Sequence, residues 1–286
     1  MKALFRALDI LEALAQADHG LTVQQLAART RMPRSTVYRF LGILARKGLI
    51  QGEAGGRTYR LGLVLFRWGA AVSGRIEVRR LAIPVMEELA AKSGESAFLS
   101  VREGLTSLCI ESRESVSPLR YTPRLGMALP LHAGAASRIL LADEVLHRRI
   151  HLPQLRLDRL TPFTLTGRAE LGRRLDEIRA RGYETSEEEI FEGTMGIAAP
   201  IFDYRGEVVA ALSIGGVKER MTRFGVSGLV DLVVRGAAEV SRTLAGRPEI
   251  PASGPRGRRG EETRSVAPGA SGRASRPGPD RGRGRA

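Results

Sequence analysis

Hydrophobic residues recur at helical spacing from the start of the chain. Residues 3–17 predict an amphipathic helix with an apolar stripe made of Leu4, Ala7, Leu8, Leu11, Leu14 and Ala15. A second helix is expected to begin at Thr22, because Thr22 and Gln25 have the T-x-x-Q spacing of a capping box, and to run to about Thr30. The pattern therefore predicts two short helices at the N-terminus.

A third helix follows after a very short turn formed by Arg31 and Met32. Pro33 suits the first turn of this helix, where its missing N–H is not needed, and Gly48 is placed to cap the C-terminus. The inward apolar face of the helix consists of Val37, Phe40, Leu41 and Leu44. Two helices joined by so tight a turn are typical of a helix-turn-helix.

A glycine-rich hairpin and one more helix come next. Strand-like residues 49–51 and 57–61 flank the turn Ala54-Gly55-Gly56, which predicts the wing of a winged helix-turn-helix. Residues 63–74 then form a helical stretch that is apolar on more than one side, through Leu65, Phe66, Trp68 and Val72. We expect this linker helix to pack against another chain as the first dimer contact.

Residues 77–246 mix strand and helix patterns. Alternating runs predict two hairpins, 96–101 with 106–111 and 197–202 with 208–214. One helical face, which ends before Gly94, consists of Val78, Leu81, Ala82, Val85 and Leu89. Amphipathic helices that would cover the sheet are predicted at about 133–142, 168–181 and 226–245. These elements favour an α+β domain around an antiparallel sheet.

The length of the chain suits two domains. It has 286 residues, of which 43% are hydrophobic, and one domain typically takes roughly 100 to 200 residues. We divide it into a winged helix-turn-helix (1–62), a linker helix (63–76), a second domain (77–246) and an Arg/Gly/Pro-rich tail (247–286). The tail has hardly any aliphatic residue to offset its conformational entropy, so we expect it to be disordered.

The sequence carries no signal for export or membrane insertion. It has no run of about 18 apolar residues, and its N-terminus lacks the apolar region of a signal peptide. Its single cysteine, Cys109, excludes an intramolecular disulfide and agrees with a reducing compartment. We therefore expect a cytoplasmic protein.

Positive charge is concentrated at the two ends of the chain. The net charge is +14, and residues 1–65 and 247–286 each carry ten basic against four acidic residues. The 181 residues between them contribute only +2. This distribution points to a polyanionic partner for the terminal regions.

The third predicted helix combines basic and hydroxyl side chains on the face opposite its apolar residues. Arg34 and Arg39 can bond guanine or phosphate, Ser35 and Thr36 lie at the helix N-terminus where phosphate oxygens bind, and Tyr38 can pack on a sugar or a thymine methyl. In the wing, Arg57 would reach the flanking backbone or the minor groove. A plain helical bundle with a solvated basic face is the alternative, but the order of cap, turn, proline, basic face and glycine hairpin favours double-stranded DNA as the ligand.

Several motifs resemble the IclR family of bacterial transcriptional regulators. In the N-terminal part they are Arg6-Ala7-Leu8-Asp9-Ile10-Leu11, the stretch from Pro33 to Arg39, and Tyr59-Arg60-Leu61-Gly62. Downstream they are Leu129-Pro130-Leu131-His132-Ala133, Arg181-Gly182-Tyr183, Gly196-Ile197-Ala198-Ala199-Pro200 and Ala210-Ala211-Leu212-Ser213-Ile214. Their shared order covers roughly residues 1–246 and makes the resemblance specific.

The resemblance implies a GAF-like C-terminal domain that binds a small metabolite, and a homodimer or dimer of dimers on a partly palindromic operator. We therefore expect a transcriptional regulator, in particular a repressor, that is not an enzyme and uses no cofactor. The family's effector-binding positions fall on Gly126, Met127, Ser186, Glu187, Thr194, Gly196, Ser213 and Gly215.

Three of these positions depart from the family pattern. The family often has a carboxylate where this chain has Ser186, a cysteine at Gly196 and a hydroxyl residue at Gly215. Loss of polar groups would enlarge the cavity and reduce its hydrogen bonding. We therefore expect an effector bulkier or less polar than a small keto acid.

Two other readings of the sequence are weaker. An enzyme would need Cys109 with His132, but Cys109 lies in an apolar strand and is better explained as a buried thiol. His147 and His151 have the i, i+4 spacing of a metal pair, yet the residues between them lack the glutamate of H-E-x-x-H, so no metal is expected. A sequence-tolerant nucleic-acid binder that uses the basic ends is the remaining alternative.

Overall fold

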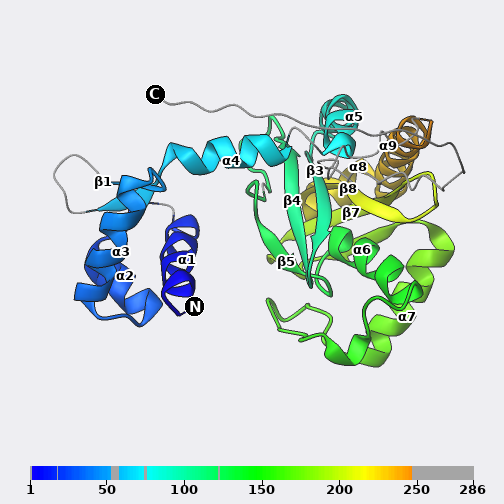
Figure 1. Ribbon diagram of the computed structural model, residues 1–286. Helices are drawn as coiled ribbons and strands as arrows, with labels where there is room; N and C mark the ends of the chain where they lie inside the picture. Colours follow the sequence, from blue (N-terminus) through cyan, green and yellow to red (C-terminus); the bar gives the residue numbers. More distant parts are fainter. Residues whose placement is uncertain (1, 18, 53–57, 74–75, 122, 247–286) are drawn as a thin grey trace, which may run out of the picture. The chain divides into compact units, whose positions relative to one another are not determined.

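Three helices and a two-stranded sheet form the N-terminal part of the computed structural model (Figure 1). The structure describes residues 2–17, 19–52, 58–73, 76–121 and 123–246. The elements of this part are α1 (Lys2–Ala15), α2 (Val23–Thr30), α3 (Arg34–Arg46), β1 (Ile50–Gly52) and β2 (Tyr59–Leu61). The predicted winged helix-turn-helix is therefore confirmed as a fold.

Local chemistry explains where α2 and α3 begin. Gln25 N–H donates to Thr22 Oγ1 at 3.2 Å and Thr22 N–H donates to Gln25 Oε1 at 2.8 Å, so the predicted capping box is formed. Arg31, with φ of 53°, ends α2 in the left-handed conformation. Pro33 precedes α3 as its N-cap, with ψ of 143°, and so does not lie inside the first turn as predicted.

The apolar stripe predicted for the first helix is wrong in part. Leu4 and Leu8 are exposed, whereas Ile10, Ala13 and Leu14 are buried against the other two helices. The helix therefore packs mainly through its C-terminal half, with Ala7 and Leu11 partly buried against the same core.

A six-stranded antiparallel sheet with the strand order β5-β4-β3-β8-β7-β6 forms the centre of the C-terminal part. Its strands are β3 (Ser96–Glu103), β4 (Thr106–Arg113), β5 (Ala128–Pro130), β6 (Glu184–Glu187), β7 (Thr194–Phe202) and β8 (Val208–Val217). The helices are α4 (Leu63–Ser73), α5 (Glu77–Ser93), α6 (Ala135–Leu146), α7 (Arg168–Arg181), α8 (Lys218–Phe224) and α9 (Val226–Ala245), with a 3-10 turn at Leu152–Gln154. The predicted α+β domain and both predicted hairpins are confirmed.

Helices cover both faces of this sheet (Figure 1). Leu99, Ile197 and Leu212 point to one face and form a core with α5 and α9. Ala198 and Ala211 point to the other face, called the α6 face below, and pack with α6 and α7. Successive residues of a strand alternate between the two faces, so the register decides which side chains reach the α6 face.

The two shortest strands of the six-stranded sheet and the shortest described α-helix were not predicted from the sequence. β5 has three residues, β6 has four and α8 has seven, which is too little for a periodic pattern to stand out. The predicted bounds 168–181 and 226–245 match α7 and α9, and α6 extends beyond its predicted end to Leu146. None of the helices in the described ranges has the length and apolar character needed to cross a bilayer.

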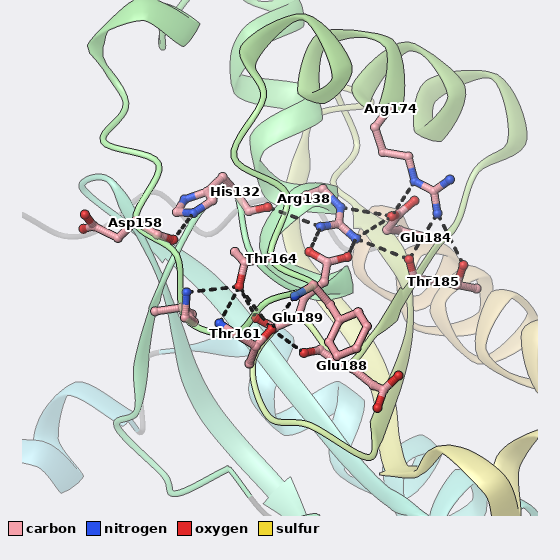
Figure 2. Close-up of polar contacts among 12 residues, drawn as sticks. His132, Arg138, Asp158, Thr161, Thr164, Arg174, Glu184, Thr185, Glu188 and Glu189 are labelled. Carbon is pink, nitrogen blue, oxygen red and sulfur yellow. Dashed lines mark hydrogen bonds and ion pairs between the residues drawn. The ribbon is translucent and has the colours of Figure 1, made fainter.

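A buried arginine joins α6 to the edge of the sheet (Figure 2). Arg138 is 1% exposed and donates to Glu184 Oε1 on β6 from Nη2 at 2.8 Å and from Nε at 3.0 Å. It also donates to both carboxylate oxygens of Glu189, in the loop after β6, and to the carbonyl of His132. Burial acts to lower the pKa of the Arg138 guanidinium, but Glu189 and Glu184 outweigh it and raise the pKa. Arg138 therefore stays charged inside the protein.

The loop that carries Glu189 is held from a second side. Thr161 Oγ1 donates to the carbonyl of Glu188 at 2.7 Å, and Thr164 Oγ1 donates to the carbonyl of Glu189 at 2.8 Å. Figure 2 shows these threonines beside the Arg138 cluster. The cluster and the threonines together fix the β6–β7 loop next to the α6 face of the sheet.

We predict that Arg138→Met destabilises the C-terminal domain by about 3–5 kcal/mol, because Glu189 loses its cation and the buried Glu184 keeps only its ion pairs with Arg174 and Arg181. Urea unfolding followed by circular dichroism measures this loss. Arg173→Met is the matched control, since Arg173 is an exposed residue of α7 with no ion pair to any described residue. A loss for Arg138→Met no larger than that of the control would contradict the role given to Arg138.

Candidate DNA interface and effector cavity

One face of α3 carries the predicted DNA-contacting side chains. Arg34, Ser35, Tyr38 and Arg39 are exposed, and Thr36 is half-buried at the margin. The opposite face of α3 is buried through Val37, Phe40, Leu41 and Leu44. The structure thus brings five of the six predicted residues together on one solvent-facing surface of a helix.

Packing inside the helix-turn-helix orients this surface. The guanidinium carbon of Arg39 lies 5.4 Å from the centroid of the Phe40 ring, and that ring is anchored in the core. Ser35 lies in the first turn of α3, where the first N–H groups favour an anion such as a phosphate, whereas the N–H of Thr36 already donates to the carbonyl of Pro33 at 3.0 Å. The face therefore offers a directed cation and a helix N-terminus to a nucleic-acid backbone.

The wing is tied to the helices by backbone hydrogen bonds. Leu21 N–H donates to the carbonyl of Tyr59 at 2.9 Å, and Tyr59 N–H donates back to Leu21 at 2.9 Å. β1 and β2 pair in antiparallel register, with Ile50 opposite Leu61. Arg57, the predicted wing contact, lies outside the described residues.

Three of the predicted effector residues form one row across the α6 face of the sheet. Ser186 on β6 pairs with Gly196 on β7, which pairs in turn with Gly215 on β8. Ser213 lies two residues before Gly215 and therefore points to the same face, and Thr194 lies two residues before Gly196. The antiparallel register alone brings these five residues of three strands together.

The other three predicted positions lie away from this row. Glu187 follows Ser186 in β6 and so points to the opposite face, where its carboxylate is 3.1 Å from Nζ of Lys218 on α8. Gly126 N–H donates to the carbonyl of Cys109 at 2.8 Å, and Cys109 N–H donates to Met127 at 3.0 Å. Gly126 and Met127 thus lie beside β4, and neither lines the cavity over Gly196.

Aromatic side chains fill the space above the row. An added methyl group at Gly215 would lie 2.8 Å from Cδ1 of Tyr121 and 3.2 Å from Cε2 of Phe98. The cavity that remains beside Tyr121, Ser186 and Gly196 has a volume of about 40 Å³. The expectation that small residues enlarge the cavity is therefore wrong for this conformation, because Tyr121 occupies the room that Gly215 leaves.

Tyr121, Phe98 and Phe191 were not predicted as site residues. Tyr121 comes from the segment between β4 and β5, Phe98 from β3 and Phe191 from the β6–β7 loop, so only the fold brings them together. The glycine at position 215 was the one sign in the sequence of a closely packed ring, because a glycine has no side chain to collide with it. Burial raises the pKa of the Tyr121 hydroxyl, and the charge of a Cys109 thiolate would raise it further.

Cys109 and the three histidines of the alternative catalytic and metal-binding pairs have the following surroundings. Cys109 is buried, and burial, partly offset by the backbone of Glu111, raises the pKa of its thiol to about 11. Nε2 of His132 is 2.9 Å from the carbonyl oxygen of Asp158. His147 follows the last residue of α6, so His147 and His151 do not share a helix, and the described ranges hold no group of three metal-ligating side chains.

Comparison with known families covers both halves of the chain. The family model described as "IclR helix-turn-helix domain" matches residues 3–54, and the model described as "Bacterial transcriptional regulator IclR C-terminal" matches residues 70–242. The chain is 36% identical over 248 residues to the HTH-type transcriptional regulator BhcR of Paracoccus denitrificans, an alignment that covers 86% of this chain and 88% of BhcR. It is 32% identical over 246 residues to the HTH-type transcriptional repressor AllR of Escherichia coli, with 85% and 90% covered.

Solved structures give the same result. The IclR protein of Thermotoga maritima superposes with a TM-score of 0.69 at 29% identity, covering 86% of this chain and 99% of that one. An IclR homologue from Microbacterium hydrocarbonoxydans, solved in complex with 4-hydroxybenzoate, superposes with a TM-score of 0.72 at 27% identity, covering 86% and 100%. The chain therefore belongs to the IclR family of bacterial transcriptional regulators and is a DNA-binding regulator.

Proposed function

We propose that this regulator is a cytoplasmic repressor that binds a double-stranded operator through α3 and releases it when a small molecule occupies the C-terminal domain. The observation that carries the proposal is the exposed α3 face with Arg34, Ser35, Tyr38 and Arg39 above a fully apolar underside. Thr36 and Arg57 complete the proposed DNA contacts. Repression is supported by the relative AllR, which is named a repressor.

The effector site that we propose lies on the α6 face of the C-terminal sheet. Ser186, Thr194, Gly196, Ser213 and Gly215 surround it, and we leave Gly126, Met127 and Glu187 out of it, because they lie away from this row. The Microbacterium relative is a precedent for a small ligand in this family, since its structure holds 4-hydroxybenzoate. Neither a metal nor a cofactor has a part in this function.

We infer that the protein has no catalytic role. The Cys109 thiol is buried and its pKa of about 11 leaves almost no thiolate at neutral pH, whereas the thiolate is the nucleophilic form. Nε2 of His132 forms a hydrogen bond with the carbonyl oxygen of Asp158. A sequence-tolerant nucleic-acid binder remains the rival function, and salt dependence separates it from an operator-specific regulator.

We propose that α4 forms a dimer contact. Its described side chains are all exposed or half-buried, with Phe66 75% exposed and Trp68 57% exposed. Apolar side chains at this density on one helix are unfavourable in water and favour association with a second copy. The proposed division is then a DNA-binding domain (1–62), a linker helix (63–76), an effector-binding domain (77–246) and a tail (247–286), and the tail lies outside the described residues.

We predict that Arg39→Ala weakens binding to the DNA segment upstream of its own gene by about 5- to 150-fold, because one arginine contact to a base contributes about 1–3 kcal/mol. A gel-shift assay near the wild-type Kd measures the loss. Arg242→Ala, at an exposed position of α9, is the charge-matched control. If the variant bound this DNA with the wild-type Kd, Arg39 would not be a DNA contact.

The same assay distinguishes the rival function. An operator-specific complex keeps a specificity ratio of roughly a thousandfold over random DNA as salt rises. Phosphate-only binding ignores sequence and weakens steeply with salt. Equal affinity of the wild type for both DNAs at every salt concentration would contradict operator recognition.

We predict that Trp68→Glu shifts the protein toward the monomer, since a carboxylate cannot be buried unpaired in an apolar interface. Sedimentation velocity of the wild type and the variant measures the change. Phe224→Glu, which changes an exposed aromatic residue of α8, serves as the control and is expected to sediment like the wild type. Identical sedimentation of Trp68→Glu and wild type would exclude α4 as the main dimer contact.

A further inference from the structure

A tyrosine of the chain itself occupies the proposed effector site. The Tyr121 ring lies 5.8 Å from the Phe98 ring in an edge-to-face arrangement and 5.7 Å from the Phe191 ring. Its third contact is Gly215, where even a methyl group would be too close to the ring. Two aromatic walls and a glycine floor thus form a space shaped for one six-membered ring.

The segment that carries Tyr121 is fastened on the side that precedes the ring. Ser115 N–H donates to Ser96 Oγ at 3.0 Å, and Ser115 Oγ donates to the carbonyl of Gly94 at 2.6 Å. Arg220, which is ion-paired with the buried Glu95, donates to Ser117 Oγ and to the carbonyl of Leu119, each at 2.9 Å. These hydrogen bonds position the segment up to residue 119. Tyr121 follows the last of the residues that they hold.

Ring contacts, and not hydrogen bonds, hold Tyr121 itself in place. Its hydroxyl makes no hydrogen bond to any residue of the described ranges. Moving the side chain out of the cavity therefore breaks no hydrogen bond within that part of the chain. The movement removes only the contacts of the ring to Phe98, Phe191 and Gly215. Another aromatic ring in the same position would restore these contacts.

The size of the site agrees with an exchange of rings. The remaining cavity of about 40 Å³ is too small for a metabolite, whereas an apolar cavity of about 150 Å³ binds benzene. The space needed becomes available only when the phenol ring of Tyr121 leaves. The remaining cavity, lined by Ser186 and Thr194, then has room for a small polar substituent on the incoming ring.

The charge of the site argues against a small anion. The cavity beside Tyr121 is lined by no lysine or arginine of the described ranges, and Glu189 is its charged neighbour. Arg138 lies behind Glu189 and is already paired with two carboxylates. An anionic group in this cavity would therefore meet no cation among the lining residues.

We propose, resting on the effector role argued above, that Tyr121 is a built-in occupant of the effector cavity and that the effector is a monocyclic aromatic compound of phenol size whose ring replaces it. Tyr121 then sets ligand specificity, because only a ring recovers the contacts that its departure removes. Tyr121 also keeps the cavity closed when no such compound is present.

Calorimetry with p-cresol, the tyrosine side chain as a free molecule, tests this proposal on the full chain without DNA. Tyr121→Ala is expected to bind one p-cresol at least tenfold more tightly than the wild type, since no ring has to be displaced. Tyr204→Ala, which removes an exposed tyrosine in the β7–β8 turn, is the control and should match the wild type. Binding by Tyr121→Ala no tighter than by the wild type would overturn the proposal.

A measurement on the wild type avoids any folding defect of the alanine variant. The chain has five tyrosines, so fluorotyrosine labelling gives few fluorine resonances, and Tyr121→Phe, which keeps the ring, assigns the one from Tyr121. Saturation with p-cresol should move the Tyr121 resonance toward its position in unfolded protein. Binding that leaves this resonance unmoved, or no binding, would overturn the ring exchange.

The calorimetric result is independent of gene regulation. Tight p-cresol binding by Tyr121→Ala in a protein whose operator affinity responds to no compound would support the ring site and contradict the proposed regulation. Operator release by an acyclic compound, with no p-cresol binding by Tyr121→Ala, would overturn the aromatic effector and leave the regulator intact.

Discussion

The ion pairs of the buried Arg138 guanidinium hold the edge of the C-terminal domain together. The guanidinium joins α6 to β6 through Glu184 and to the β6–β7 loop through Glu189, and a charge at this depth is tolerable only because both carboxylates neutralise it. Arg174 and Arg181 of α7 add further ion pairs to Glu184. The edge strand, two helices and the loop beside the cavity are thus held by one network of charges.

This network also places the walls of the proposed effector site. Ser186 follows Glu184 by two positions and therefore points to the same face, next to Gly196 and Gly215. Phe191 follows Glu189 by two residues in the loop that the network fixes. A ligand that enters this cavity must therefore displace the more weakly held Tyr121 and not the charged frame around it.

Elements with a local cause could be predicted from the sequence, and those made by distant contacts could not. The Thr22–Gln25 capping box, α7 and α9 depend on neighbouring residues and were predicted with their bounds. The pairing of Arg138 with Glu184 spans 46 residues, and Tyr121 meets Gly215 only through the fold. Glu187 was misplaced because family positions do not state which face of a strand they occupy, whereas the register does.

We propose that a ligand in the C-terminal domain controls a specific DNA-reading face of α3. DNase footprinting of the full chain on the region upstream of its own gene, with and without individual small metabolites, tests it most directly. We expect one protected, partly palindromic segment that one compound releases. Uniform protection without sequence preference, unaffected by every compound and lost as salt rises, would contradict it.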